Sequence, residues 1–267
     1  MNILKQFVVW VNVPVESANH YKLTEYIDYL LSKRLKPKTI NCHLDCIRGF
    51  YDYLYHEEGI KVVNPVKKIS TLRLAKPLPR HLNEDEVMTL FDIIKKPRDR
   101  AIFKVMLRCG LRVEEVADLS FADIDLKRKK IFVRNGKGGK GRVVFISNDA
   151  RNAIVDYLRA RKPSRTKKVF VVEKGAYKGK PISVRGIQKR MEYYARKAKI
   201  KVSCHQLRHT MATQLLNAEA AVVTIQDLLG HNWITTTERY CTVSNLKVMR
   251  DYFKAMDVIM ARDARDP

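Results

Sequence analysis

The stretch from residue 64 to residue 80 constrains the fold of this 267-residue chain more than any other feature, because it interrupts the apolar pattern. It contains three prolines and five lysines or arginines, and a proline disfavours helix at the residue before it. Apolar positions recur at helical spacing on both sides of this stretch but not across it. We therefore expect an N-terminal helical domain over residues 1–75 and a second, larger domain over residues 76–267.

Two helices are predicted in the N-terminal domain. The first covers residues 20–35 and the second begins near Thr39, each with apolar side chains three or four residues apart. These side chains form narrow stripes of the kind that pack against a neighbouring element. The tyrosines near the stripes are therefore expected to be core or interface residues, and base stacking is the weaker interpretation.

Capping and stop signals divide the second domain into further helices. Residues 83–86 have the pattern of a capping box, and an apolar helix over residues 100–108 is predicted to end at Gly110. Two short runs rich in β-branched and aromatic residues, 130–134 and 142–146, flank a loop with four glycines, which is typical of a hairpin. The expected fold is therefore mainly α-helical with a small antiparallel β element.

The segment from Ser203 to Val243 concentrates side chains that can bind a phosphate group. Ser203 is expected to cap a helix that begins at His205, and spacings of three and four residues bring Arg208 and His209 close to His205. A guanidinium beside an imidazole suits a phosphate. The start of this helix is therefore a candidate anion-binding surface.

The same segment then leaves the helical pattern. A second apolar helix is predicted to end at Gly230, so that His231 begins a loop, and Tyr240 follows nine residues later, after a run of threonines and a charged pair. Tyr240 is therefore expected to be partly accessible. The segment as a whole supplies an acid–base pair and a phenol next to cationic groups.

The formal net charge of +24 is concentrated in residues 127–201, which hold 25 lysines and arginines against four acids. This block also carries apolar segments, with helices expected around residues 150–160 and 183–198, so it is a folded basic surface. Such a surface favours a polyanion partner over a merely solvated basic face. The residues expected to bind this polyanion are Lys140, Arg142, Lys189 and Arg190.

The five cysteines are odd in number and scattered, which favours a reducing cytoplasm over a disulfide framework. Cys42, His43 and Cys46 have the spacing of a partial metal site, but no second ligand pair follows, so core packing is the better interpretation. No apolar run approaches the roughly 20 residues of a membrane span, and the N-terminus lacks a signal peptide. We therefore expect a cytoplasmic protein with no metal site and no membrane partner.

Three motifs, in a fixed order, resemble those of a known family. Gly-Leu-Arg-Val-Glu-Glu-Val (110–116) comes first, then Gly-Lys-Gly-Gly-Lys-Gly-Arg (136–142), and then His-x-Leu-Arg-His-Thr (205–210), followed by Leu-Gly-His231 and Tyr240. This set resembles the catalytic core of the tyrosine site-specific recombinases, the phage-integrase and Xer-like family. The glycine loop does not match a nucleotide-binding loop, because it leads into a strand and lacks the Gly-Lys-Ser/Thr ending.

The resemblance implies a two-domain DNA clamp that cuts and rejoins strands without metal, ATP or another cofactor. Tyr240 is the expected nucleophile, which forms a 3′-phosphotyrosyl link, and Lys137 is expected to protonate the departing 5′ oxygen. Glu115 is expected to orient the catalytic arginine and histidine. The other expected catalytic residues, which hold the phosphate and exchange the nucleophile's proton, are Arg112, His205, Arg208 and His231.

The active form implied by the resemblance is a homotetramer on synapsed DNA, with or without a second recombinase. Its task is then chromosome-dimer resolution, integration and excision, or plasmid maintenance.

From Leu246 to Met260 the apolar positions are again three and four residues apart, which predicts a helix with one apolar stripe. Either its own domain covers that stripe or, as the resemblance implies, a neighbouring subunit does.

Three other functions are weighed against this interpretation. A metal-dependent nuclease needs clustered carboxylates, and the basic block holds only four acids. A type IB topoisomerase would share the chemistry without synapsis. A DNA-binding regulator would retain only the fold and is expected to lose some of the six catalytic side chains, all of which are present. For Arg112 taken alone, a surface ion pair without a chemical role is the simplest alternative.

Overall fold

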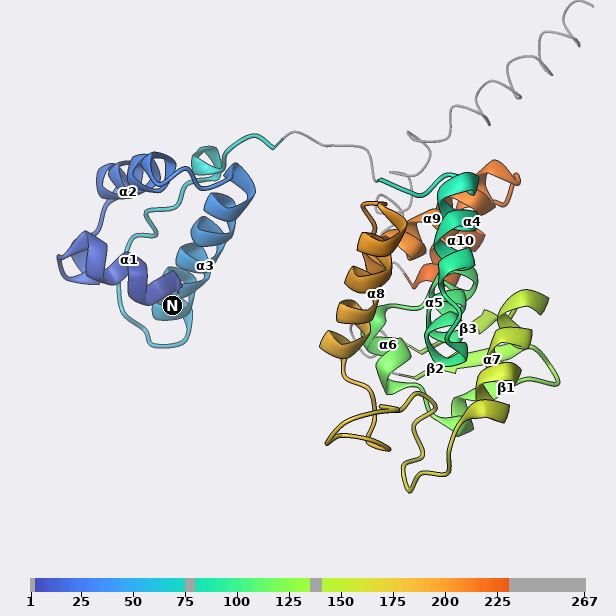
Figure 1. Cartoon of the computed structure of the whole chain (residues 1–267). Coiled ribbons are helices and arrows are strands. Elements are labelled where there is room, and N and C mark those ends of the chain that lie inside the picture. Colours follow the sequence, from blue (N-terminus) through green and yellow to red (C-terminus); the bar gives the residue numbers. More distant parts are fainter. Residues whose placement is uncertain (1–2, 75–79, 135–140, 231–267) are drawn as a thin grey trace, which may run out of the picture. The chain divides into compact units, whose positions relative to one another are not determined.

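The computed structural model describes residues 3–74, 80–134 and 141–230, and the chain forms two compact units, Met1–Pro77 and Leu78–Pro267 (Figure 1). Each unit has an apolar core of its own. The boundary between the units falls within the proline-containing stretch that interrupts the apolar pattern. DNA binding by the first unit stays a prediction.

Several expected functional positions lie outside the described residues. They are Lys137, Lys140, His231, Tyr240 and the segment from Leu246 to Met260.

The described part of the N-terminal unit is helical. Its helices are α1 (Ile3–Val11), α2 (His20–Ser32) and α3 (Pro37–His56), and short 3-10 turns cover Val15–Ser17 and Lys68–Ser70. The two predicted helices are confirmed as α2 and α3. Helix α1 was not predicted, because residues 7–11 form a continuous apolar run that shows no helical period.

The core of this unit contains aromatic side chains on the apolar stripes of α2 and α3. Tyr26 and Tyr51 are buried, and the Tyr26 hydroxyl lies 3.1 Å from Nδ1 of His43. These two tyrosines are therefore core residues, as predicted. The expected burial of the nearby cysteines is wrong for Cys42, which is exposed, and Cys46 is half-buried. The reason is geometric, since positions 42 and 46 share the face of α3 that points away from the core.

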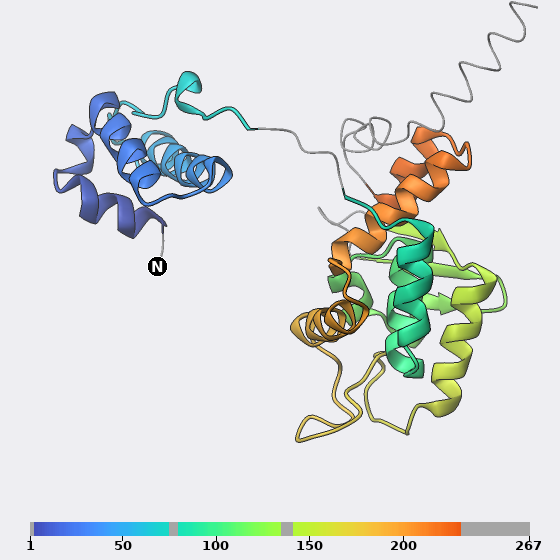
Figure 2. The same cartoon turned by 45° about the horizontal axis from the view of Figure 1, so that its top comes forward.

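The described part of the C-terminal unit contains seven helices and a 3-10 turn. The elements are α4 (Glu84–Ile93), α5 (Pro97–Cys109), α6 (Val113–Asp118), the 3-10 turn Phe121–Asp123, α7 (Asn148–Ala160), α8 (Val184–Ala198), α9 (Cys204–Asn217) and α10 (Val222–Leu229). Helix α5 packs against α7 and α9, and α4 packs against α8 (Figures 1 and 2). Helix α5 is central because apolar residues occupy nearly all of its circumference, including Phe103, Val105 and Met106.

A small antiparallel sheet completes the C-terminal unit. Its strands are β1 (Ile124–Asp125), β2 (Lys130–Val133) and β3 (Arg142–Phe145), in the order β1-β2-β3. Ile131 pairs with Val144 and Val133 with Arg142, so the predicted hairpin is confirmed. The inward side chains of this pair of strands enter the core, because successive residues of a strand face opposite sides. Strand β1 was not predicted, since two residues are too few for a pattern.

Candidate active site

The first motif begins where helix α5 ends. Gly110 has a φ of +66° and terminates α5 in the left-handed conformation that glycine adopts without strain. A Cβ at this position would lie 2.6 Å from Sδ of Met211 on α9, so the glycine also permits close packing of the two helices. Arg112 then occupies the N-cap position of α6.

Glu115 links two arginines that are distant in the sequence. Its Oε2 accepts from the main-chain N–H of Arg112 at 2.8 Å, and its Oε1 accepts from the Arg112 guanidinium at 2.9 Å. Both oxygens also accept from the guanidinium of Arg142 on β3, each at 2.7 Å. Burial alone raises the pKa of Glu115, but the hydrogen bonds and charges of Arg142 and Arg112 lower it to about 2. Glu115 is therefore ionised at any physiological pH.

Arg208 is a buried cation on α9. Its guanidinium donates to the carbonyl oxygens of Gly110, at the end of α5, and of Leu229, at the end of α10. The last carbonyls of a helix have no partner within the helix, and they carry the negative end of its dipole. Arg208 therefore joins the ends of two helices at the site.

Three arginines meet the carbonyl end of α10. The oxygens of Leu228 and Gly230 accept from Arg142 at 2.8 Å and from Arg112 at 3.3 Å, and the Leu229 oxygen between them accepts from Arg208. Gly230 has a φ of +58°, which ends the helix as predicted. The C-terminal end of α10, at Gly230, therefore lies beside three guanidinium groups.

His205 lies one turn before Arg208, in the first turn of α9. Ser203 is the N-cap of this helix, and its main-chain N–H donates to the side chain of Gln206 at 2.7 Å, so the predicted cap is confirmed. His205 is an exposed residue, but desolvation of its ring and the charges of Arg208 and Arg112 lower its pKa from the usual 6.5. The neutral imidazole is therefore favoured, and its ring contacts that of His209 with centroids 4.2 Å apart.

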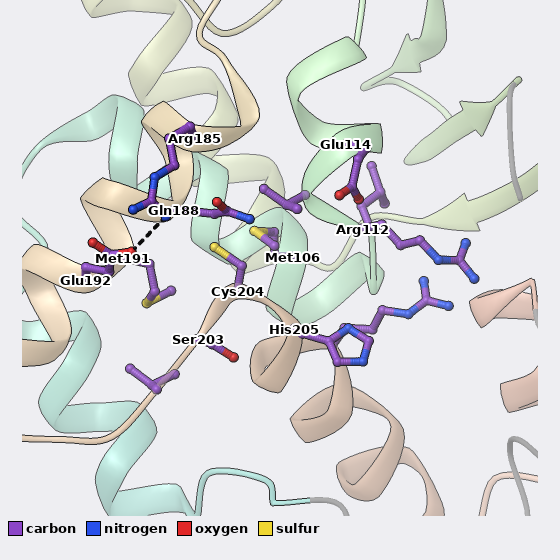
Figure 3. Close-up of a pocket in the computed structure, with 14 residues that line it drawn as sticks. Met106, Arg112, Glu114, Arg185, Gln188, Met191, Glu192, Ser203, Cys204 and His205 are labelled. Atoms are coloured by element: carbon purple, nitrogen blue, oxygen red, sulfur yellow. Dashed lines mark hydrogen bonds and ion pairs between the residues drawn. The ribbon is translucent and has the colours of Figure 1, made fainter. Parts of the chain in front are cut away.

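Arg112, His205 and Arg208 line one cavity with a volume of about 480 Å³. Figure 3 shows the side chains of Arg112 and His205 reaching from separate helices toward the same side of this cavity. Helix α8 supplies another part of the wall, through Arg185 and Gln188. The cavity thus joins residues of the first and third motifs. In the sequence, 92 residues lie between Arg112 and His205.

The four expected DNA-binding residues differ in their surroundings. Lys189 is exposed, and Lys140 lies outside the described residues. The side chain of Arg142 is only 9% exposed and is held by Glu115 and Leu228. Arg190 donates to the buried Asp99 at 2.8 Å. DNA contact by Arg142 and Arg190 stays a prediction, but their contacts indicate that both hold the protein together.

Sequence reasoning did not find the role of Arg142 as a partner of Glu115 or the shared carbonyl end of α10. No local signal points to either, because the partners are 27 and 86 residues from Arg142. Among the described residues no group of three or more His, Cys, Asp or Glu side chains is placed to hold a metal ion. No helix in that part of the chain is long and apolar enough to span a membrane.

Comparison with known proteins places these features in a family. A model of the phage integrase family matches residues 80–246. The chain is 32% identical over 265 residues to the tyrosine recombinase XerC of Thermodesulfovibrio yellowstonii, covering 95% of this chain and 87% of that protein. It is 33% identical over 249 residues to the tyrosine recombinase XerA of Pyrococcus furiosus, covering 91% and 84%.

Solved structures show the same fold. The crystal structure of XerA recombinase aligns with a TM-score of 0.60 and 26% identity, over 95% of this chain and 89% of that chain. The XerH recombinase in a post-cleavage complex with a palindromic difH substrate aligns with a TM-score of 0.76 and 19% identity, over 93% and 76%. The mainly helical fold with a small antiparallel sheet is therefore that of the tyrosine recombinases.

Proposed function

Because the chain belongs to the phage integrase family and is a site-specific DNA recombinase of the tyrosine type, we propose that Tyr240 attacks a phosphodiester held by Arg112, Arg208 and His205. The observation that supports this assignment is the presence of the last three side chains on one cavity. Two guanidinium groups there offer positive charge where a pentacoordinate phosphate gains negative charge.

The reaction needs cationic groups because a phenol with a pKa near 10 is a poor nucleophile and a phosphodiester is negatively charged. Tyr240 loses its proton, its oxygen forms a bond to phosphorus, and the bond to the 5′ oxygen breaks. Lys137 gives a proton to that oxygen. One phosphate ester replaces another, so a 5′ hydroxyl from a second strand can reverse the step without ATP or another cofactor.

The histidines hold the phosphate and move the proton. His205, with its lowered pKa, is neutral near pH 7, so one ring nitrogen can accept a proton or a hydrogen bond. His231 is the second such group, at the start of the segment that follows α10. Glu115 orients Arg112, which is supported by its two hydrogen bonds to that residue.

The working assembly is a homotetramer on two synapsed DNA sites, in the cytoplasm, with or without a second recombinase. The N-terminal unit contacts one face of the duplex and the C-terminal unit the other. DNA as the partner is supported by the basic block of residues 127–201 and by the complex of XerH with its difH substrate. The similar proteins are recombinases, so the topoisomerase and regulator alternatives are not favoured.

Covalent trapping tests this function. The protein is incubated with fragmented genomic DNA in EDTA and denatured with SDS, and the DNA ends that remain attached are sequenced. Wild-type protein is expected to form the adduct in EDTA, whereas Tyr240→Phe keeps DNA binding and forms none. Tyr177→Phe, which changes an exposed tyrosine of the same unit, is the matched control and forms the adduct normally. Adducts in Tyr240→Phe, or a requirement for a divalent cation, would remove this mechanism.

A further inference from the structure

The side chain of Arg142 makes contacts with the site that the pairing of the two hairpin strands does not require. The main-chain register with Val133 already pairs β2 and β3. The side chain, 9% exposed, uses both terminal nitrogens on Glu115, at 2.7 Å each, and Nε on the carbonyl oxygen of Leu228, at 2.8 Å. It therefore connects the hairpin, helix α6 and the end of α10.

The charges in this network do not cancel. Glu115 is a single carboxylate shared by the guanidinium groups of Arg112 and Arg142, which leaves one net positive charge. Without Arg142, both carboxylate oxygens would turn to Arg112, and the remaining pair would be neutral. The attraction of Arg112 for a phosphate would then fall, because a closely paired carboxylate offsets its charge.

We propose that Arg142 is a positioning residue for strand cleavage, which engages Glu115 so that the charge of Arg112 remains directed at the scissile phosphate. This inference rests on the proposed function, in which Arg112 binds that phosphate. It gives Arg142 a role through other residues, and does not make it a DNA contact.

Gly230 supplies a second observation, independent of the charges. A Cβ at this position would lie 2.9 Å from Cδ and 3.4 Å from Nε of Arg142. The glycine therefore ends α10 and also leaves the space through which the Arg142 side chain reaches Glu115. The left-handed conformation explains why a glycine ends α10. The close approach of the Arg142 side chain is a separate reason why position 230 has no room for a Cβ.

The test compares Arg142→Gln and Arg142→Lys with a matched control, Arg98→Lys. Arg98 is also a buried arginine that donates two nitrogens to a carboxylate, Asp99, and one to a carbonyl oxygen, that of Val171. It lies at the other end of α5, roughly 18 Å along a helix of 13 residues from the site. Arg98→Lys therefore reports the cost of weakening a buried ion pair away from the chemistry.

The readouts are the single-turnover rate of SDS-resistant adduct formation and the thermal unfolding midpoint of the full chain. Arg142→Gln is expected to slow cleavage by roughly 10- to 100-fold, the range known for the loss of residues that orient metal ligands, applied here to a residue that orients a catalytic arginine. Arg142→Lys keeps the charge but not the bidentate geometry, and is expected to lie between wild type and Arg142→Gln. Arg98→Lys should lower the midpoint and leave the rate of the folded protein unchanged.

The Arg142 variants and Arg98→Lys are compared at equal unfolding midpoints. If the Arg142 variants then lose no more cleavage rate than Arg98→Lys does, the inference is overturned. If Arg142→Gln does not fold, Arg142→Lys decides by the same criterion. Wild-type protein that forms no adduct would instead defeat the proposed function, so the two failures are distinguishable.

Two further arms separate charge from geometry. In a Glu115→Gln background, Arg142→Gln is expected to cost about tenfold less than in wild type, because the carboxylate that it offsets is gone. Equal losses in both backgrounds would contradict the role assigned to Glu115. A substrate with sulfur as the 5′ bridging atom needs no proton on its leaving group. It should not rescue Arg142→Gln, and rescue would transfer the effect from Arg112 to the hairpin lysine Lys137.

Discussion

Arg208 donates a hydrogen bond to the carbonyl oxygen of Gly110, so the arginine of the third motif is anchored on the first residue of the first motif. The two residues are 98 positions apart. The contact depends on Gly110, whose left-handed conformation turns the chain at the end of α5. The position of one candidate phosphate-binding group is therefore tied to the backbone that presents the other, Arg112.

We predict that Gly110→Ala destabilises the C-terminal unit. The added Cβ would meet Sδ of Met211 at 2.6 Å, and a left-handed alanine is strained, so the unfolding free energy should fall by about 1–3 kcal/mol. Gly49→Ala, inside α3 with no atom within 4 Å of the new Cβ, is the control and should stabilise its helix by about 0.5–1 kcal/mol. Thermal unfolding measures both, and an unchanged Gly110→Ala protein would contradict the close packing.

The ion pairs of Glu115 predict a loss of stability in acid. Its pKa of about 2 lies below the usual 4.5, so the stabilisation is fully present above pH 4.5 and is lost as the pH falls toward 2. Between pH 7 and pH 3 the contribution should fall by about 2 kcal/mol. Urea unfolding at several pH values should show this loss in wild type and not in Glu115→Gln. Parallel pH profiles of the two proteins would count against the network.

His205 predicts the acid limb of the cleavage reaction. Because burial and the two arginines lower its pKa, the imidazole of His205 stays neutral to a pH below 6.5. The single-turnover cleavage rate should therefore stay constant until the pH falls below 6.5. Below pH 6.5 the unfolded chain protonates His205 more readily than the folded protein does. His205 therefore lowers the free energy of unfolding only as the pH falls below 6.5. A pH–rate profile whose acid limb is centred above 6.5 would assign the limb to another group.

Lys189 and Arg190 are adjacent, yet we expect the loss of the first to affect DNA binding and the loss of the second to affect stability. Lys189 is exposed, so Lys189→Ala should weaken DNA binding and reduce the salt slope by about 0.9 without changing stability. Arg190→Ala removes one partner of Asp99, which is fully buried, and should lower the unfolding free energy by about 1–3 kcal/mol. Fluorescence anisotropy at several salt concentrations and thermal unfolding distinguish these outcomes. A stable Arg190→Ala protein with weakened DNA binding would make Arg190 a DNA contact.

The segment after Tyr240 carries a prediction from its sequence pattern. If the apolar stripe from Leu246 to Met260 docks on a neighbouring subunit, Phe253→Asp should preserve folding and half-site binding and abolish synapsis and strand exchange. Asp251→Lys, on the predicted polar face, is the control. Gel mobility of half-site and synaptic complexes provides the measurement. An unfolded Phe253→Asp protein would indicate docking on its own unit, and normal recombination would exclude docking on a neighbour.

Local rules were sufficient for many of the elements. The helix ends at Gly110 and Gly230, the cap at Ser203 and the hairpin around residues 134–142 each depend on residues a few positions apart, and all were predicted. Helix α1 was missed because a continuous apolar run carries no period. The candidate catalytic side chains come from the resemblance of the three motifs to those of the tyrosine recombinases, and their roles stay predictions.

Only the tertiary structure decided which charges act together. By sequence Arg142 and Arg190 are two cations among the 25 of a basic block, equally suited to contact DNA. In the fold, Arg142 is bound to Glu115 and Leu228, and Arg190 to Asp99, 91 residues away. The physical reason is that helix and strand periods arise from neighbours along the chain, whereas an ion pair forms between whichever charged groups the packing of distant elements brings within hydrogen-bonding distance.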